Sequence, residues 1–300
     1  MARSSLPGPD GLVVVDKPAG WTSHDVVAKS RGLLGTRKVG HAGTLDPDAT
    51  GVLLLGVGRG TKLLRFLSPL GKAYVGEVVL GTETSTLDAA GDVTAVHTMD
   101  GTTLEQVRAA AVAFVGDILQ IPPMVSAVKV GGKRLHELAR QGIEIEREPR
   151  PVTVHHLEVL PGPPDEPLVF TLAVECSSGT YIRTLAADIG HALGGGAHLR
   201  NLRRTSVGPF TLADAVPLEK VSPESLRPLV EAVRHLPRVD AGEDLAAAVS
   251  QGKVFDGRVL GALATWPGPW AIVGPGEDLL AVYEPYRGDT VKPSVVVRID

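Results

Sequence analysis

Two aspartates flank a proline in HAGTLDPDATG, residues 41–51. An ionised carboxylate is one of the side chains that can act as a covalent nucleophile. Because Asp46 precedes Pro47, its backbone is biased towards extended torsions, which can project the carboxylate from a turn. Asp48 lacks that constraint and could stabilise the next turn, and the segment as a whole also fits a purely structural connection. Spacing alone favours Asp46 and leaves Asp48 open.

A second segment with chemical potential is SSGTYIRTLAADIG, residues 177–190. A glycine-containing turn leads into a predicted helix, so the positive end of the helix dipole lies beside Tyr181 and Arg183. An arginine there can hold a carboxylate ionised and oriented through paired, charge-assisted hydrogen bonds. Taken alone, the segment also fits a surface arginine and a half-buried tyrosine on an ordinary helix.

Other catalytic and metal-binding motifs are weak in this sequence. GVGRGTK, residues 56–62, lacks the spacing of a phosphate-binding loop. The sequence contains neither a G-x-S-x-G nor an H-E-x-x-H motif, which argues against serine hydrolases and zinc proteases. The single cysteine, Cys176, excludes an internal disulfide and a cysteine-cluster metal site, and its apolar neighbours indicate a buried structural thiol. We expect no metal.

The elements that must position these residues are strands and helices in mixed order, which favours an α+β fold with a mixed sheet over a doubly wound one. Apolar runs predict strands near residues 12–15, 51–58, 73–81, 152–160 and 168–176. Helical spacing predicts helices at residues 26–33, from a capping box at Thr102 or Thr103 to about Phe114, and at residues 181–193.

The length of 300 residues suggests two domains. A boundary is expected in LPRVDAGED, which gives a catalytic domain at residues 1–238 and a small β-rich domain at residues 239–300. The first residues lack the apolar core of a signal peptide, and no apolar run approaches the roughly 18 residues that span a bilayer. We therefore expect a cytoplasmic location and no membrane partner.

The distribution of charge matters more than the net charge of −4. Residues 1–75 contain ten Lys and Arg against five Asp and Glu, residues 121–150 contain six against four, and residues 195–210 contain three against none. Such segregation indicates basic patches suited to a nucleic acid, although solvated faces of mixed charge remain an alternative.

Five segments together resemble the TruB family of tRNA pseudouridine-55 synthases: DKPAGWTSHDVV, GHAGTLDPDATGVLLLGVGRGTK, KAYVGEVVLGTETSTLDAAGDV, SSGTYIRTLAADIG and LRRTSVGPF. The match covers roughly residues 11–212 in the family's order. The resemblance implies a pseudouridine-synthase fold, with a mixed, largely antiparallel central sheet and the active site in a central cleft. It also implies a bacterial enzyme that isomerises uridine 55 in the T-arm of tRNA. The last segment is similar to a short, actinobacterial-type PUA-like domain.

The resemblance assigns roles to individual residues. The family's catalytic aspartate falls on Asp46, which decides against Asp48. The Y-I-R motif falls on Tyr181 and Arg183, and the tyrosine of the K-x-Y motif falls on Tyr74.

Further positions are implied to contact or support the substrate site. Leu202 contributes to the uracil pocket, His41 helps to splay the T-loop, and Lys17 supports the site. KVGGKRLHELARQG is expected to form a basic loop that closes on the T-arm, with His136 where the family commonly has tyrosine. The basic residues of this loop are Lys129, Lys133, Arg134 and Arg140.

The implied chemistry explains these residue types. Forming pseudouridine requires cleavage of the C1′–N1 bond, rotation of the base and formation of a C1′–C5 bond, so no cofactor is expected. An ionised carboxylate can attack C1′ or C6, and the sequence does not distinguish the two. Arg183 would supply the countercharge, and Tyr181 is a hypothetical proton acceptor. The base must first leave its stack and be held by groups such as Tyr74 and Leu202.

Two other functions fit parts of the sequence. An RNA-binding chaperone that folds tRNA without chemistry would account for the basic blocks. A carboxylate-based glycoside hydrolase is weaker, because the sequence places no second acid. A monomer is expected, and the role of the C-terminal residues and the existence of further target uridines stay open.

Overall fold

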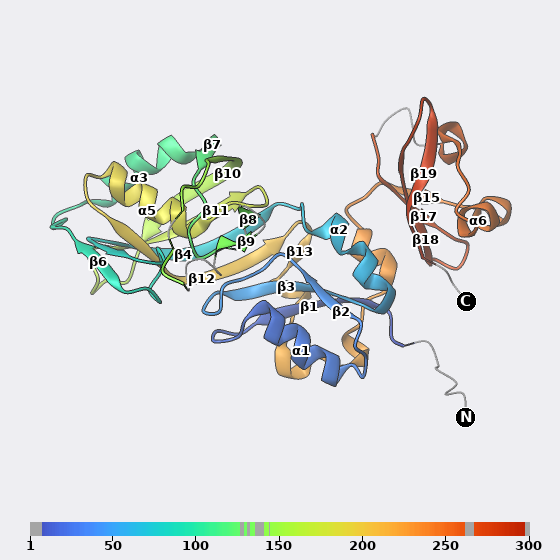
Figure 1. The fold of residues 1–300 in the computed structure, drawn as a ribbon, viewed down its shortest axis with the longest axis horizontal. Coiled ribbons are helices and arrows are strands. Elements are labelled where there is room, and N and C mark those ends of the chain that lie inside the picture. The colour runs from blue at the N-terminus through green and yellow to red at the C-terminus, as the bar shows by residue number, and fades with distance from the viewer. Residues whose placement is uncertain are drawn as a thin grey trace. The chain divides into compact units, whose positions relative to one another are not determined.

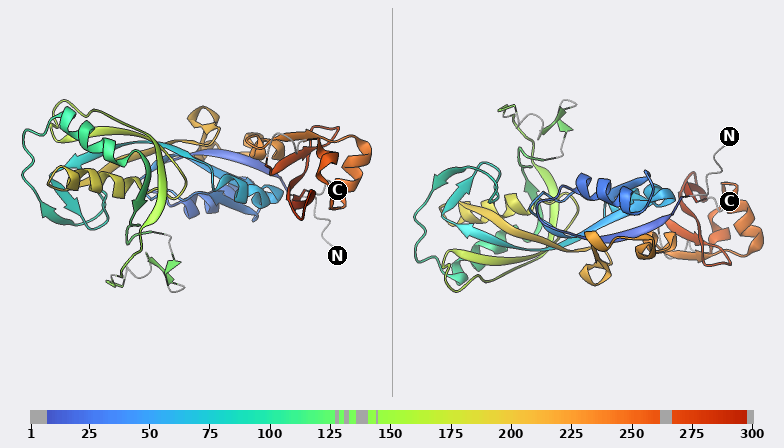
Figure 2. Two further views of the ribbon diagram at one scale, coloured as in Figure 1. Left: turned by 90° about the horizontal axis from the view of Figure 1, so that it is seen from above. Right: turned by 90° about the horizontal axis from the view of Figure 1, so that it is seen from below.

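The computed structural model describes residues 8–126, 129–130, 133–135, 141–143, 145–261 and 267–297 (Figures 1 and 2). The chain forms two compact units. Unit 1 comprises Met1–Pro47, Val52–Pro69 and Val207–Asp300, and unit 2 comprises Asp48–Gly51 and Leu70–Ser206. The N-terminal segments therefore belong with the C-terminal third of the chain.

Unit 1 contains a small mixed sheet. Strand β1 is almost wholly buried and pairs in parallel with β14, whereas β2 and β3 pair antiparallel. Helix α1 packs its apolar residues Val26 and Val27 into the same core as Val13 and Leu55, which explains the predicted helical spacing. The elements are β1 (Gly11–Lys17), α1 (Ser23–Leu33), β2 (Val39–Ala42), β3 (Thr50–Val57), α2 (Leu64–Leu67), β13 (Phe210–Thr211) and β14 (Val216–Pro217).

Unit 2 is built on a sheet in the order β12, β4, β11, β10, β7, in which the β4–β11, β11–β10 and β10–β7 pairs are antiparallel. Helices α3 and α5 contact each other and the strands β10 and β4 respectively, so both cover one face of this sheet (Figure 1). The elements are β4 (Lys72–Leu80), α3 (Leu104–Ala111), β7 (Gly116–Gln120), β10 (Arg150–Pro161), β11 (Val169–Cys176), α5 (Ile182–Ala192) and β12 (Ala197–Val207).

Short elements connect these larger ones. Two hairpins are formed by β5 (Thr82–Thr84) with β6 (Val93–Val96) and by β8 (Lys129–Val130) with β9 (Lys133–Arg134). The 3-10 helices are η1 (Gly58–Leu63), η2 (Val112–Phe114), η3 (Leu212–Asp214), η4 (Leu218–Lys220), η5 (Pro223–Ser225), η6 (Leu229–Val233) and η7 (Gly257–Leu260).

The last part of unit 1 forms a separate five-stranded sheet in the order β15, β17, β18, β19, β16. Trp270 and Tyr283 are fully buried in its own core, which confirms the predicted small β-rich module. The boundary predicted at residue 238 stays a prediction. The elements are β15 (Arg238–Asp240), α6 (Glu243–Ser250), β16 (Phe255–Asp256), β17 (Trp270–Val273), β18 (Leu279–Pro285) and β19 (Thr290–Val296).

Two local expectations are confirmed, the start of one helix and the burial of the cysteine. Of the two capping boxes predicted for the helix that runs to about Phe114, the one formed by Thr103 and Gln106 begins α3. Cys176 is buried, and burial raises the pKa of its thiol to about 11, as a structural thiol requires. In the described part of the chain, no helix is long and apolar enough to cross a membrane, and no group of three or more His, Cys, Asp or Glu could hold a metal ion.

Candidate active site

A buried lysine holds the loop that contains the predicted nucleophile. Lys17, at the end of β1, is fully buried. Its ammonium donates hydrogen bonds to the carbonyl oxygens of Trp21 at 2.6 Å, Pro47 at 2.7 Å and Pro18 at 3.0 Å. Three acceptors match the three N–H groups of an ammonium, so the buried charge is compensated by backbone oxygens. We call this arrangement the lysine clamp.

Two further contacts fix the same loop to the start of α1. The hydroxyl of Ser23 accepts a hydrogen bond from the Leu45 amide at 2.9 Å and donates to the Leu45 carbonyl at 3.2 Å. The Gly20 amide donates to the Pro47 carbonyl at 3.0 Å. Asp46 lies between these two anchored residues and is half-buried. The loop backbone is therefore restrained on both sides of the aspartate.

Helix α1 begins where this network ends. Thr22 and Asp25 form a capping box, and hydrogen bonds from the Thr22 hydroxyl and amide lower the pKa of the Asp25 carboxyl. His24, in the first turn, lies edge-on to His41 of β2 with ring centroids 5.2 Å apart. The position predicted for the T-loop contact thus has an aromatic neighbour that the sequence reasoning missed.

In unit 2, Arg183 is held by oxygen atoms on several sides. It is buried in the first turn of α5, and its two terminal nitrogens donate to the carbonyls of Thr86 at 2.7 Å and Val125 at 2.9 Å. Its Nε lies 3.5 Å from the carboxylate of Asp88. These contacts fix the plane of the guanidinium, so its orientation is set by the protein.

Asp88, the acidic neighbour of Arg183, is a candidate site residue that sequence reasoning did not single out. Its carboxylate accepts hydrogen bonds from the Thr86 hydroxyl at 2.5 Å and the Ala90 amide at 3.1 Å. The preceding residue, Leu87, has φ of +62°, a torsion that is strained for a branched side chain. The signal was the polar turn TSTLDAAGD, which contains two aspartates, Asp88 and Asp92, without assigned partners.

Tyr181 is oriented through its backbone. Its amide donates to Gln120 Oε1 at 2.7 Å, and Gln120 Nε2 donates to the Tyr181 carbonyl at 3.0 Å. Gln120 lies at the end of β7 and is buried. A primary amide that satisfies both backbone groups of one residue fixes that residue at the start of α5. The sequence gave no sign of this pair, because the two residues lie 61 positions apart.

Tyr74, Leu202 and Arg204 share one face of the sheet in unit 2. Tyr74 and Gly76 point to the same side of β4 because they are two residues apart. A Cβ atom at Gly76 would lie 3.3 Å from Leu202 Cδ1, so Leu202 covers this glycine beside Tyr74. Arg204 is fully buried; burial lowers the pKa of its guanidinium, and the Tyr74 hydroxyl opposes that shift by accepting a hydrogen bond.

A second buried cation lies near Arg204. Burial, and then the charge of Arg204, lower the pKa of Lys72 to about 8. Its ammonium donates to the Leu70 carbonyl at 2.6 Å. Among the described residues of unit 2, the cationic side chains of Lys72, Arg183 and Arg204 are buried.

The two units thus divide the predicted residues. Unit 1 contains Lys17, His41 and Asp46, and unit 2 contains Tyr74, Tyr181, Arg183 and Leu202. The pairing of Asp46 with Arg183 stays a prediction. Of the basic loop, Lys129 and Arg134 pair across the β8–β9 hairpin, which also contains Lys133, whereas Arg140 and His136 lie outside the described residues.

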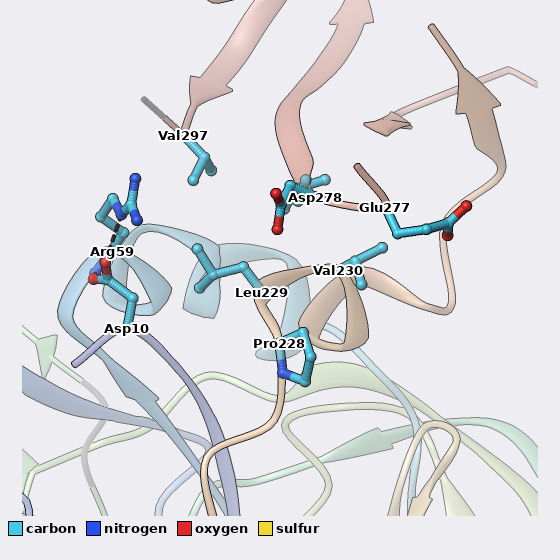
Figure 3. A pocket seen from close by; sticks show the side chains of 9 residues that line it. Asp10, Arg59, Pro228, Leu229, Val230, Glu277, Asp278 and Val297 are labelled. Carbon is cyan, nitrogen blue, oxygen red and sulfur yellow. Dashed lines mark hydrogen bonds and ion pairs between the residues drawn. The ribbon is translucent and has the colours of Figure 1, made fainter. Parts of the chain in front are cut away.

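A cavity of about 190 Å³ lies elsewhere in unit 1 (Figure 3). Its walls include Leu229 of η6 and Val297. Arg59 and Asp278 lie on opposite sides, and Asp10 forms an ion pair with Arg59 at 2.6 Å. None of these residues belongs to the predicted site, so the cavity is separate from the residues expected to do chemistry.

Comparisons with known proteins bear on both units. The profile of the TruB family pseudouridylate synthase N-terminal domain matches residues 31–182, and that of the tRNA pseudouridylate synthase B C-terminal domain matches residues 183–234. The chain is 45% identical over 303 residues to tRNA pseudouridine synthase B of Geobacillus thermodenitrificans, covering 96% of this chain and 100% of that protein. It is 48% identical over 293 residues to the protein of that name from Rhodococcus jostii, covering 96% and 94% respectively.

Solved structures agree with this match. The fold superposes on a chain of a Cbf5–Nop10–Gar1 complex with a TM-score of 0.72 and 29% identity, covering 95% of this chain and 84% of that one. A chain of an archaeal box H/ACA Nop10–Cbf5 complex gives a TM-score of 0.68 at 26% identity, covering 96% and 85%. The α+β fold with a mixed, largely antiparallel sheet expected from the sequence is confirmed.

Proposed function

Because the chain belongs to the TruB family of pseudouridylate synthases, we propose that it isomerises uridine 55 in the T-arm of tRNA to pseudouridine. The assignment of tRNA pseudouridine synthase activity is based on relatives of that name, which match nearly the whole chain. Three details of the proposal go beyond this general activity: the position of the target uridine, the identity of the nucleophile and the extrusion of the base.

The observation that carries the assignment of the nucleophile is the lysine clamp. Asp46 follows Leu45, which is bonded to Ser23, and precedes Pro47, whose carbonyl binds Lys17 at 2.7 Å. A nucleophile whose backbone is fixed before the substrate arrives loses little entropy in reaching its attack position. Asp46 is thus the side chain of this loop best suited to attack C1′ or C6.

The buried cations of unit 2 support the same mechanism. We assign Arg183 as the countercharge of the Asp46 carboxylate, with Asp88 fixing the guanidinium from its Nε side. Tyr74 and Leu202 would hold the uracil ring after it leaves its stack, and Arg204 would keep the Tyr74 ring in place. The C1′–N1 bond breaks and N1 keeps the electron pair, the C1′–C5 bond forms, and the proton on C5 is lost to a base, for which Tyr181 is the candidate. N1 takes up a proton from solvent, so the product is an isomer of the substrate.

Recognition of the T-arm is assigned to the surface around the site. His41 and the β8–β9 hairpin would contact the loop of the RNA, which suits recognition of a folded single-stranded loop by shape and by extruded bases. A monomer suffices for this mechanism, since every proposed residue comes from one chain.

The decisive experiment compares Asp46→Asn with Asp48→Asn. A T-arm transcript labelled with tritium at C5 of its uridines releases tritium as pseudouridine forms. We expect Asp46→Asn to lower the rate at least about 10⁴-fold, because an amide cannot act as the nucleophile. Asp48→Asn should stay within about threefold of the unchanged protein. Undiminished turnover by Asp46→Asn would contradict the proposal, and mapping of pseudouridine in full-length tRNA tests the position.

The segregated basic blocks also fit an RNA-folding chaperone without chemistry. The same two variants separate this function, because a chaperone would refold unmodified tRNA equally well with Asn at position 46. Both functions can coexist in one protein, and the tritium assay measures the isomerase alone.

A further inference from the structure

Trp21 exposes an indole beside the aspartate loop. It immediately precedes Thr22, the N-cap residue of α1, and is 37% exposed. Trp270, by contrast, is fully buried in the C-terminal sheet. A partly exposed indole leaves apolar surface in water, so burial alone does not explain a tryptophan at this position.

The lysine clamp ties Trp21 directly to the aspartate loop. One ammonium, that of Lys17, binds the carbonyl of Trp21 at 2.6 Å and that of Pro47 at 2.7 Å. On the two sides of Trp21, the Gly20 amide donates to Pro47, and Ser23 exchanges two hydrogen bonds with Leu45. The backbone of Trp21 is thus fixed relative to the residues on both sides of Asp46.

The electrostatic surroundings suit an RNA loop. The nearest acid along the chain, Asp25, has its carboxylate engaged by the Thr22 amide at 3.0 Å and the Thr22 hydroxyl at 2.6 Å. Trp21 also lies at the positive end of the 11-residue helix α1. The positive helix end favours the negatively charged phosphates of an RNA. The neutral indole face beside it is suited to stack with an uncharged base of that RNA.

A structural role for Trp21 must be separated from binding. An apolar residue just before an N-cap often packs on the fourth helical residue, here Val26, which is fully buried. Such packing needs an apolar side chain and no aromatic ring. Leucine would therefore preserve the structural role, and only an aromatic residue would preserve stacking.

We propose that Trp21 is a stacking surface for an unpaired nucleobase of the RNA substrate, next to the uridine attacked by Asp46. Unpaired bases in RNA loops are commonly held on aromatic side chains, and stacking accepts any base because every base has a π face. This inference rests on the proposed function, since it takes the RNA at the aspartate loop as the substrate.

Indole fluorescence tests the stacking directly. In the Asp46→Asn protein, which we expect to bind without turnover, a T-arm stem-loop should quench the emission, and the added substitution Trp21→Phe should remove most of that quenching. The Trp21→Phe protein serves as the reference because the remaining tryptophans stay in place. Quenching that persists without Trp21 would overturn the proposal, as would a stem-loop that binds without any quenching.

Binding constants separate stacking from packing. In the same background, Trp21→Leu should weaken binding of the stem-loop about 10- to 100-fold, and Trp21→Phe no more than about threefold. Both variants should melt within about 2 °C of each other. If Trp21→Leu binds as tightly as Trp21→Phe, Trp21 has a structural role and the proposal is wrong.

A kinetic measurement distinguishes this proposal from the proposed function. With Asp46 intact, Trp21→Leu should raise KM with kcat within about threefold, because the stacked base does not react. Turnover by Asp46→Asn would refute the nucleophile and leave the fluorescence result standing. Unchanged KM in Trp21→Leu would refute the stacking surface and leave the isomerase standing.

Discussion

The two units use buried cations in different ways. In unit 1, the Lys17 ammonium donates to three backbone carbonyls and fixes the loop that contains Asp46. In unit 2, the Arg183 guanidinium is itself the group assigned to the reaction, and carbonyls and Asp88 fix its orientation. The first cation organises the backbone, and the second is the proposed source of positive charge for the reaction.

This difference predicts which property each substitution changes. Loss of Lys17 should first affect folding of the loop, whereas loss of Arg183 should first affect the rate of the reaction. The comparison would be wrong if loss of Lys17 mainly lowered the rate and loss of Arg183 mainly lowered the stability.

The largest effect is expected from Lys17→Met. It leaves three carbonyls without their buried donor, so we expect the free energy of unfolding to fall by about 3–5 kcal/mol. Urea denaturation measures this loss. Lys17→Arg is the matched control: it keeps the charge but presents a planar fork in place of an ammonium, and it should recover only part of the stability. Unaltered unfolding of Lys17→Met would show that the clamp contributes no stability.

The next effect is expected from Arg183→Lys. Lysine keeps the positive charge but does not reproduce the three directions in which the guanidinium is held, so kcat should fall about 100-fold. The unfolding transition should move less than that of Lys17→Met. A single-turnover tritium assay measures the rate, and equal losses of stability in the two variants would remove the distinction between the cations.

Lys72 is a third buried cation, and its burial disfavours the charged form. Its pKa of about 8 in the folded protein lies below the ordinary value of 10.5, so the unfolded chain binds more protons between these two pH values. The contribution of Lys72 to the free energy of unfolding should therefore rise as the pH increases from 8 to 10.5.

The measurement is the difference in free energy of unfolding between the unchanged protein and Lys72→Met. This difference should shift in favour of the unchanged protein by about 2 kcal/mol between pH 8 and 10.5. Other titrating groups are common to both proteins and cancel. A difference that stays constant with pH would mean that Lys72 is not perturbed by burial.

The smallest effect is expected from Asp88→Asn. Asparagine can still accept from Thr86 and Ala90 through its oxygen, so the loop should fold, but the charge beside Arg183 is lost. We expect kcat to fall about tenfold with little change in stability. Asp92→Asn, in the same turn region, is a suitable control, and it should leave kcat unchanged.

Much of the fold and part of the site could be predicted from the sequence. Apolar runs and helical spacing predicted β1, α1 and α5, because their buried faces dictate residue type. The motif around Asp46 was recognised by its proline and glycine pattern. The structure adds a reason for Gly51, where a Cβ atom would lie 2.1 Å from the Arg204 carbonyl.

Other features have no local signal. Leu87 has φ of +62°, a backbone torsion that leucine disfavours. Its surrounding contacts, and not its residue type, maintain this torsion. The Gln120–Tyr181 pair joins residues far apart in sequence, and neither residue type predicts contact with the other. The grouping of Val207–Asp300 with the N-terminal segments likewise depends on tertiary contacts.

The lysine clamp has a consequence for thermal behaviour. Because a single ammonium is shared by carbonyls of Pro18, Trp21 and Pro47, none of these segments can swing away without weakening the hold on the others. On heating, the loop should therefore open in one cooperative step, and activity should vanish abruptly instead of fading over a broad range of temperature.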